Sequence, residues 1–155
     1  MSRLVVPIIG KKLWSTGDVK LTAELSLFLK DAAGQWHLRS FRVDSGSEVT
    51  TYPAFEAKQL GLPIPIQAVP RVLHAQTGRE VRSGYLRFQV MGMDQTEYIV
   101  PCLFLGDPDQ APSGPQASFP RMLLQPLALL DNLRFVLEKD PNSTAIYGHL
   151  VVEKK

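Results

Sequence analysis

A single acidic residue, Asp44, stands between an apolar, strand-like approach and a turn of small residues, in the run VDSGSEVT from Val43 to Thr50. A positioned carboxylate can act as a general base toward water. Two carboxylates held about 3 Å apart cannot both ionise, so they share a proton, and one can activate water while the other protonates a carbonyl oxygen. The chain has one Asp-Ser-Gly triplet. A two-fold homodimer would supply the second Asp44.

The residues before Asp44 predict a β-hairpin. Apolar side chains alternate with mostly polar ones at period two, which indicates a half-buried strand. A turn-prone segment, 31–34, then leads into the β-rich run Trp36–Val43. Asp44 is therefore expected at the end of a strand. The alternating apolar residues of the first strand are Val19, Leu21, Ala23, Leu25, Leu27 and Leu29.

The residues after Asp44 predict a short helix and a second hairpin. The segment Pro53–Gly61 has good helix formers and ends in glycine, a common stop residue. Two β-rich runs, Arg71–Leu73 and Gly84–Met91, frame the polar stretch HAQTGREVRS, with Gly78 near the tip of the hairpin. A polar, exposed tip of this kind can move.

The C-terminal part combines short strands with one long irregular segment. Gln95–Leu105 is predicted to be a strand, in which Pro101 favours an edge position or a bulge. Residues 106–120 are rich in Pro, Gly and Ser without periodicity, which predicts a long loop. About eight to ten strands and two short helices indicate an all-β or mainly β fold. The remaining predicted elements are strands at Met122–Leu124, Leu133–Leu137 and Ala145–Val152, and a helix at Pro126–Asp131.

Composition limits the function classes. The 155 residues, of which 45% are hydrophobic and 21% charged, predict one folded domain over residues 1–155. A net charge of +2 from scattered Lys and Arg argues against a nucleic-acid partner. No apolar run approaches the length of a membrane span. One cysteine, Cys102, excludes an internal disulfide and CxxC-type zinc sites. We expect a soluble, cytoplasmic protein with no cofactor or metal and no membrane partner.

The run Val43–Thr50 resembles the active-site signature of retropepsin-like aspartic proteases. Three further segments extend the resemblance over most of the chain, from Phe41 to Phe135. One position departs from the family pattern, because Gln125 stands where the family usually has glycine after an apolar pair. The three segments are EAKQLGL at 56–62, HAQTG at 74–78 and MLLQPLALLDNLRF at 122–135.

The resemblance implies a closed, acid-protease-like β-barrel lobe that assembles as a two-fold homodimer, without cofactors. It implies that Asp44 is catalytic and that a peptide or protein substrate binds under a flap hairpin at about 71–91. Gly46 would let the loop backbone approach its counterpart closely, and the Ser45 hydroxyl would bond across the two-fold axis. The implied loop-supporting residues are Ser45, Gly46, Ser47 and Thr50, and the implied substrate-binding residues are Glu48, His74, Ala75, Gln76, Thr77 and Gly78.

Two other functions fit the sequence. Gln125 is compatible with a retropepsin-like domain that has lost hydrolysis and serves as a dimerisation or peptide-binding module. Alternatively, an unrelated β-barrel could bind a ligand while Asp44 merely turns the chain. The sequence also leaves open whether residues 1–30 pair at a dimer interface or cover the sheet.

Overall fold

The computed structural model describes residues 3–12, 16–17, 19–44, 49–65, 80–111, 123–139 and 147–155. These ranges hold ten strands, one α-helix and one 3-10 helix. The strands are β1 (Arg3–Lys12), β2 (Val19–Thr22), β3 (Glu24–Lys30), β4 (Trp36–Val43), β5 (Thr50–Pro53), β6 (Val81–Val90), β7 (Tyr98–Leu105), β8 (Leu123–Leu124), β9 (Leu133–Lys139) and β10 (Gly148–Lys154); the helices are α1 (Ala54–Leu60) and η1 (Pro126–Leu129).

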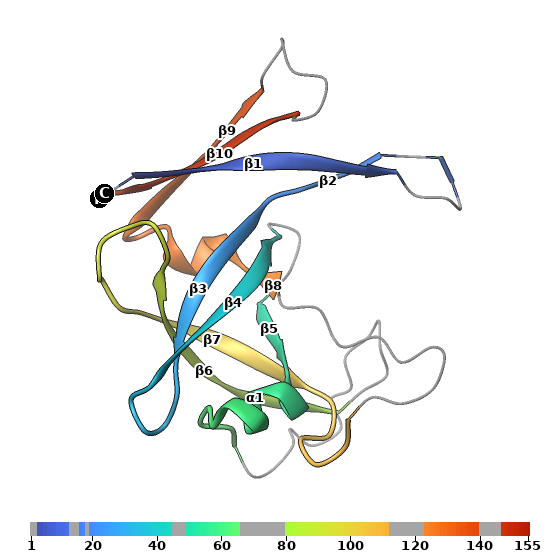
Figure 1. Cartoon of the computed structure of the whole chain (residues 1–155), viewed down its shortest axis with the longest axis vertical. Coiled ribbons are helices and arrows are strands. Elements are labelled where there is room, and N and C mark those ends of the chain that lie inside the picture. Colours follow the sequence, from blue (N-terminus) through green and yellow to red (C-terminus); the bar gives the residue numbers. More distant parts are fainter. Residues whose placement is uncertain are drawn as a thin grey trace.

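Six strands form a closed barrel in the order β3-β4-β8-β5-β7-β6. It is the lower part of the molecule in Figure 1, with α1 at the end away from the remaining strands. In β3 every second side chain is buried, as the period-two pattern predicts, and Leu25, Leu27 and Leu29 are the buried set. The predicted β-rich class with short helices is confirmed.

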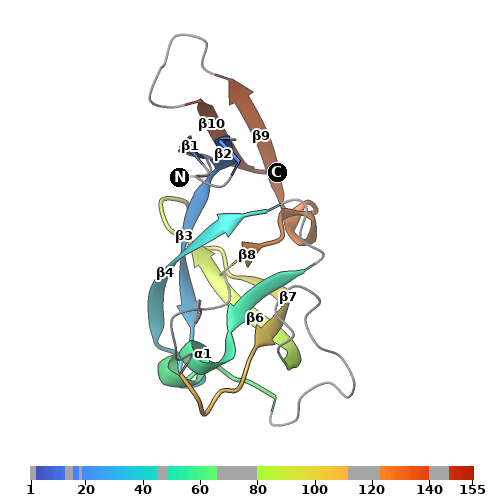
Figure 2. The ribbon, with the colours of Figure 1, turned by 90° about the vertical axis from the view of Figure 1, so that its right-hand side faces the viewer.

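The other four strands form a separate sheet in the order β2-β1-β10-β9, which lies above the barrel in Figures 1 and 2. The first and last strands are antiparallel neighbours, with Arg3 opposite Glu153. Leu4, Val6 and Ile8 of β1 pack against a buried cluster that contains residues of both the barrel and the sheet, so one core joins the two. Residues 3–12 thus pair within their own chain, which answers part of the question left open for residues 1–30.

The helix α1 begins and ends as the sequence predicts. Pro53 occupies the N-cap position, and Gly61 caps the C-terminus with φ of 77°, a left-handed conformation that glycine adopts without steric cost. The predicted second helix is shorter than expected, since η1 covers only Pro126–Leu129. Within the described ranges, no helix is long and apolar enough to cross a membrane.

Three strand predictions differ from the structure. The predicted strand at residues 19–29 is interrupted at Ala23, where the chain passes from β2 in the sheet to β3 in the barrel. Pro101 lies in an internal strand, because β7 has neighbours on both sides. It is tolerated because β5 pairs with β7 only from Cys102 onward. The strand β1, which contains Pro7, was not predicted at all.

Candidate active site

Asp44 directly follows β4 and is held by the strand beside it. β8 pairs with β4 in parallel, with Val43 opposite Leu124, and Figure 2 shows the two strands side by side. The backbone N–H of Asp44 donates to the carbonyl oxygen of Leu124 over 3.0 Å. Backbone pairing therefore fixes the position of Asp44 independently of its side chain.

Asp44 and Thr50 lie on either side of the same short strand. In the barrel, β8 separates β4 from β5, and Thr51 of β5 lies opposite Leu123. β4 ends at Val43 and β5 begins at Thr50, so the residues on both sides of the Asp-Ser-Gly segment are anchored to β8. The sequence predicts the apolar residues of β8 to be a strand. It does not predict that this strand lies between β4 and β5.

Gln125 is accommodated by hydrogen bonds from both its backbone and its side chain. Its backbone N–H donates to Oγ1 of Thr50 over 3.0 Å. Its side-chain Oε1 accepts the backbone N–H of Leu127 over 2.6 Å and caps η1. Gln125 is 6% exposed and Thr50 is 1% exposed. Glutamine here therefore links β8, β5 and η1, and the implied role of Thr50 in supporting the loop stays a prediction.

A cation lies beside the candidate catalytic carboxylate. Nη2 of Arg42 is 3.4 Å from Oδ2 of Asp44, and the two side chains are 18% and 31% exposed. Side chains two residues apart share one face of an extended chain, so the spacing alone could have indicated this pair. Sequence reasoning missed Arg42. The arrangement gives Asp44 a charged partner within its own subunit.

A buried aromatic pair fixes β4 to β5 close to the site. The ring centroids of Phe41 and Tyr52 are 5.6 Å apart, and both side chains are completely buried. Burial, together with the neighbouring Glu56 carboxylate, raises the pKa of Tyr52 above its usual range. Oε1 of Glu56 also lies 3.3 Å from Nε of Arg39. Tyr52 therefore stays neutral and acts as a packing residue.

Most of the predicted site residues lie outside the described ranges, so their positions stay predictions. Of the predicted set, the structure describes Asp44 and Thr50 and brings both to β8. Those outside the described ranges are Ser45, Gly46, Ser47 and Glu48 in the loop, and His74, Ala75, Gln76, Thr77 and Gly78 in the predicted flap. The second strand of that predicted hairpin, β6, begins at Val81, three residues earlier than expected.

No protein-family model matches the sequence, and no curated protein is significantly similar to it. One solved structure is similar, the crystal structure of a retropepsin-like aspartic protease from Rickettsia conorii. The chain is structurally similar to a retropepsin-like aspartic protease. The two chains are 19% identical, the match covers 97% of this chain and 92% of that one, and the TM-score is 0.48.

Proposed function

We propose that this chain is an aspartic endopeptidase that works as a homodimer, with one Asp44 from each subunit. The observation that carries the proposal is the position of Asp44, which begins an Asp-Ser-Gly triplet at the end of β4. Its backbone N–H is anchored by a hydrogen bond to the carbonyl oxygen of Leu124 in β8. Anchoring of this kind supports a catalytic role, because a carboxylate dyad works only at a fixed separation.

The proposed reaction is hydrolysis of a peptide bond. The ionised Asp44 removes a proton from a water molecule, whose oxygen forms a bond to the peptide carbonyl carbon. The protonated Asp44 of the second subunit gives its proton to the carbonyl oxygen. The first Asp44 then passes the proton that it took from water to the amide nitrogen as the C–N bond breaks. One hydroxyl of the tetrahedral intermediate returns its proton to the second Asp44, and an amine and a carboxylic acid leave. Substrate would bind in extended form, in contact with Glu48 and the segment 74–78.

Replacement of the carboxylate tests the proposal. Asp44→Asn keeps the size of the side chain and the backbone bond to Leu124, but it removes the base. We expect cleavage of a fluorogenic peptide library to fall to background while circular dichroism and urea unfolding stay unchanged. The control Asp131→Asn, in an exposed turn, should cleave like the wild type. Full turnover by Asp44→Asn would exclude the mechanism.

A second candidate function is a peptide-binding or dimerisation module without hydrolysis. The contact between Arg42 and Asp44 favours it, because a guanidinium 3.4 Å from Oδ2 of Asp44 occupies space beside the carboxylate that a second carboxylate or the attacking water would need. Gln125 no longer favours it, since its hydrogen bonds show how it fits. Under this candidate, the wild-type protein binds peptides but shows no cleavage that depends on Asp44.

A further inference from the structure

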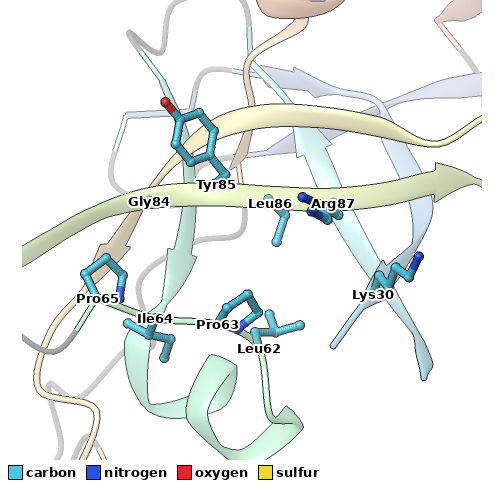
Figure 3. Close-up of a pocket in the computed structure, with 9 residues that line it drawn as sticks. All are labelled: Lys30, Leu62, Pro63, Ile64, Pro65, Gly84, Tyr85, Leu86 and Arg87. Carbon is cyan, nitrogen blue, oxygen red and sulfur yellow. The ribbon is translucent and has the colours of Figure 1, made fainter. Parts of the chain in front are cut away.

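A cavity of about 390 Å³ opens along β6. One wall is the segment Leu62–Pro65, which follows α1, and the other is Gly84–Arg87 of β6, with Lys30 at one end (Figure 3). Neither Asp44 nor Thr50 lines it. The cavity is therefore separate from the candidate active site, and a ligand bound there does not depend on the proposed function.

Beside this cavity, β6 has an edge without a strand partner among the described residues. β7 pairs with β6 along Val81–Phe88. On the other side, β3 pairs with β6 only at residues 88–90, and its last pair is Leu29 with Phe88. Between residues 84 and 87, β6 thus pairs with β7 on one side and has no strand partner among the described residues on the other.

Two hydrogen bonds near the ends of β6 show to which side its backbone N–H and C=O groups point. The carbonyl oxygen of Glu80 accepts from Gly106 N–H over 2.8 Å, on the β7 side, and Met91 N–H donates to Ser26 over 3.0 Å, on the β3 side. Alternate residues of an antiparallel strand direct their N–H and C=O groups to opposite sides. Even-numbered residues of β6 therefore face β7. Tyr85 directs its N–H and C=O toward the cavity.

The opposite wall packs against β6 without pairing to it. Two of its four residues, Pro63 and Pro65, have no backbone N–H. Pro65 is so close to Gly84 that a Cβ at residue 84 would lie 3.2 Å from Pro65 Cδ. Figure 3 shows the Leu86 side chain pointing toward this wall and that of Tyr85 pointing away from it. The cavity is therefore a groove with one hydrogen-bonding side, the edge of β6, and one apolar side, the segment Leu62–Pro65. A peptide that binds as an added strand requires both.

The end of the groove nearest β3 is positively charged. Figure 3 shows Lys30 and Arg87 at this end. Both pair with the same carboxylate, since Glu97 lies 3.4 Å from Lys30 Nζ and 3.7 Å from Arg87 Nη1. One carboxylate for two cations leaves one positive charge, which is complementary to an acidic ligand group.

We propose that this groove binds an extended acidic peptide segment of another protein as an added antiparallel strand on β6. Such a strand would continue the line of β3 beyond Lys30, because β3 is also antiparallel to β6. The N-terminal end of the peptide then lies beside Lys30 and Arg87, and its acidic residue belongs there. The exposed edge of four residues spans about 13 Å, so the recognised segment has about four residues.

Titration of the isotope-labelled, full-length protein tests the proposal by NMR. The probe is the capped peptide acetyl-Asp-Val-Thr-Val-amide, and the controls carry Lys in place of Asp or have Asp as the last residue. We expect the Tyr85 amide to shift and to exchange more slowly with solvent, with the acidic probe binding most tightly. Absence of binding at millimolar peptide, equal binding of the Lys peptide, or shifts that leave Tyr85 unchanged would overturn the proposal.

Two variants test separately how the positive charge and the backbone edge of β6 contribute to peptide binding. Arg87→Glu should weaken binding of the acidic probe by about three- to tenfold and strengthen binding of the Lys peptide, as for an exposed ion pair. Arg134→Glu, an exposed residue of β9, should change neither. Tyr85→Pro removes an N–H that faces the cavity rather than β7, so a folded variant should lose binding. Unchanged affinity in Arg87→Glu would exclude the proposed acidic ligand.

Discussion

The hydroxyl oxygen of Thr50 accepts a hydrogen bond over 3.0 Å from the backbone N–H of Gln125, although the two residues are 75 positions apart in the chain. Both are almost completely buried. The bond joins the start of β5 to the end of β8, beside the strand end that carries Asp44. The bond uses the backbone N–H of residue 125, which any residue except proline supplies, so it does not depend on the glutamine side chain.

Removal of the Thr50 hydroxyl should destabilise the fold. Thr50→Val keeps the shape of the side chain but leaves the buried N–H of Gln125 without its acceptor, at a cost of about 1–3 kcal/mol in the free energy of unfolding. Urea titration measures this quantity. Thr50→Ser retains the acceptor and should stay closer to the wild type; equal losses in both variants would assign the effect to packing instead.

The aromatic contact behind the site should contribute much more to stability than a surface residue of the same strand. Phe41→Ala removes a completely buried ring and should lower the free energy of unfolding by about 3–5 kcal/mol. Leu38→Ala, on the same strand but 44% exposed, should change it by less than about 0.5 kcal/mol. Similar losses at the two positions would contradict the burial pattern of β4.

Acid should weaken a contact that links β10 to the turn before β7. Lys154, together with Thr96, holds the pKa of Asp94 at about 2, below its ordinary value of 3.8. Because the pKa of Asp94 is lower in the folded than in the unfolded state, its ionised carboxylate stabilises the fold above pH 3.8. This contribution disappears as the pH falls from 3.8 to about 2. The stability difference between the wild type and Asp94→Asn should therefore be constant above this window and shrink within it.

Urea unfolding at several pH values measures this difference. Lys154 Nζ lies 2.8 Å from Asp94 Oδ2, and the two side chains are 40% and 33% exposed. Because salt screens exposed pairs, 1 M salt should reduce the difference above pH 4 as well. A difference that persists unchanged at pH 2 would show that the substitution acts through something other than the charge.

Mixing of subunits should reveal whether both copies of Asp44 are needed. If each active site uses one Asp44 from each subunit, a dimer of one wild-type chain and one Asp44→Asn chain has no complete dyad. Activity after co-refolding should then fall with the square of the wild-type fraction, to about a quarter in an equal mixture. Activity that falls in simple proportion would show that one subunit suffices.

The dyad also predicts how activity depends on pH. One carboxyl must be protonated and the other ionised, so we expect maximal cleavage at acidic to mildly acidic pH. A transition-state mimic with a statine-type hydroxyl should inhibit, because it occupies the position of the attacking water. Rates that stay constant into alkaline pH would exclude a shared proton.

Local sequence patterns predicted several elements well. The alternation through Leu25, Leu27 and Leu29 matches the buried face of β3, and Gly61 ends α1. Both signals act over a few residues, through side-chain periodicity and backbone conformation. The strand β1 gave no such signal. Its inward side chains, such as Leu4 and Val6, alternate with exposed residues that include Val5, so both faces look apolar.

The amino-acid sequence by itself determined the β-rich class, the strand that leads to Asp44 and the chemistry proposed for the Asp-Ser-Gly triplet. Only the tertiary structure decided that β8 lies between β4 and β5, that Gln125 bonds to Thr50 and that β6 keeps an edge facing a cavity. The physical reason is that propensity and periodicity act between near neighbours. Barrel order and strand pairing depend instead on which distant segments bury each other's apolar surface and satisfy each other's backbone groups.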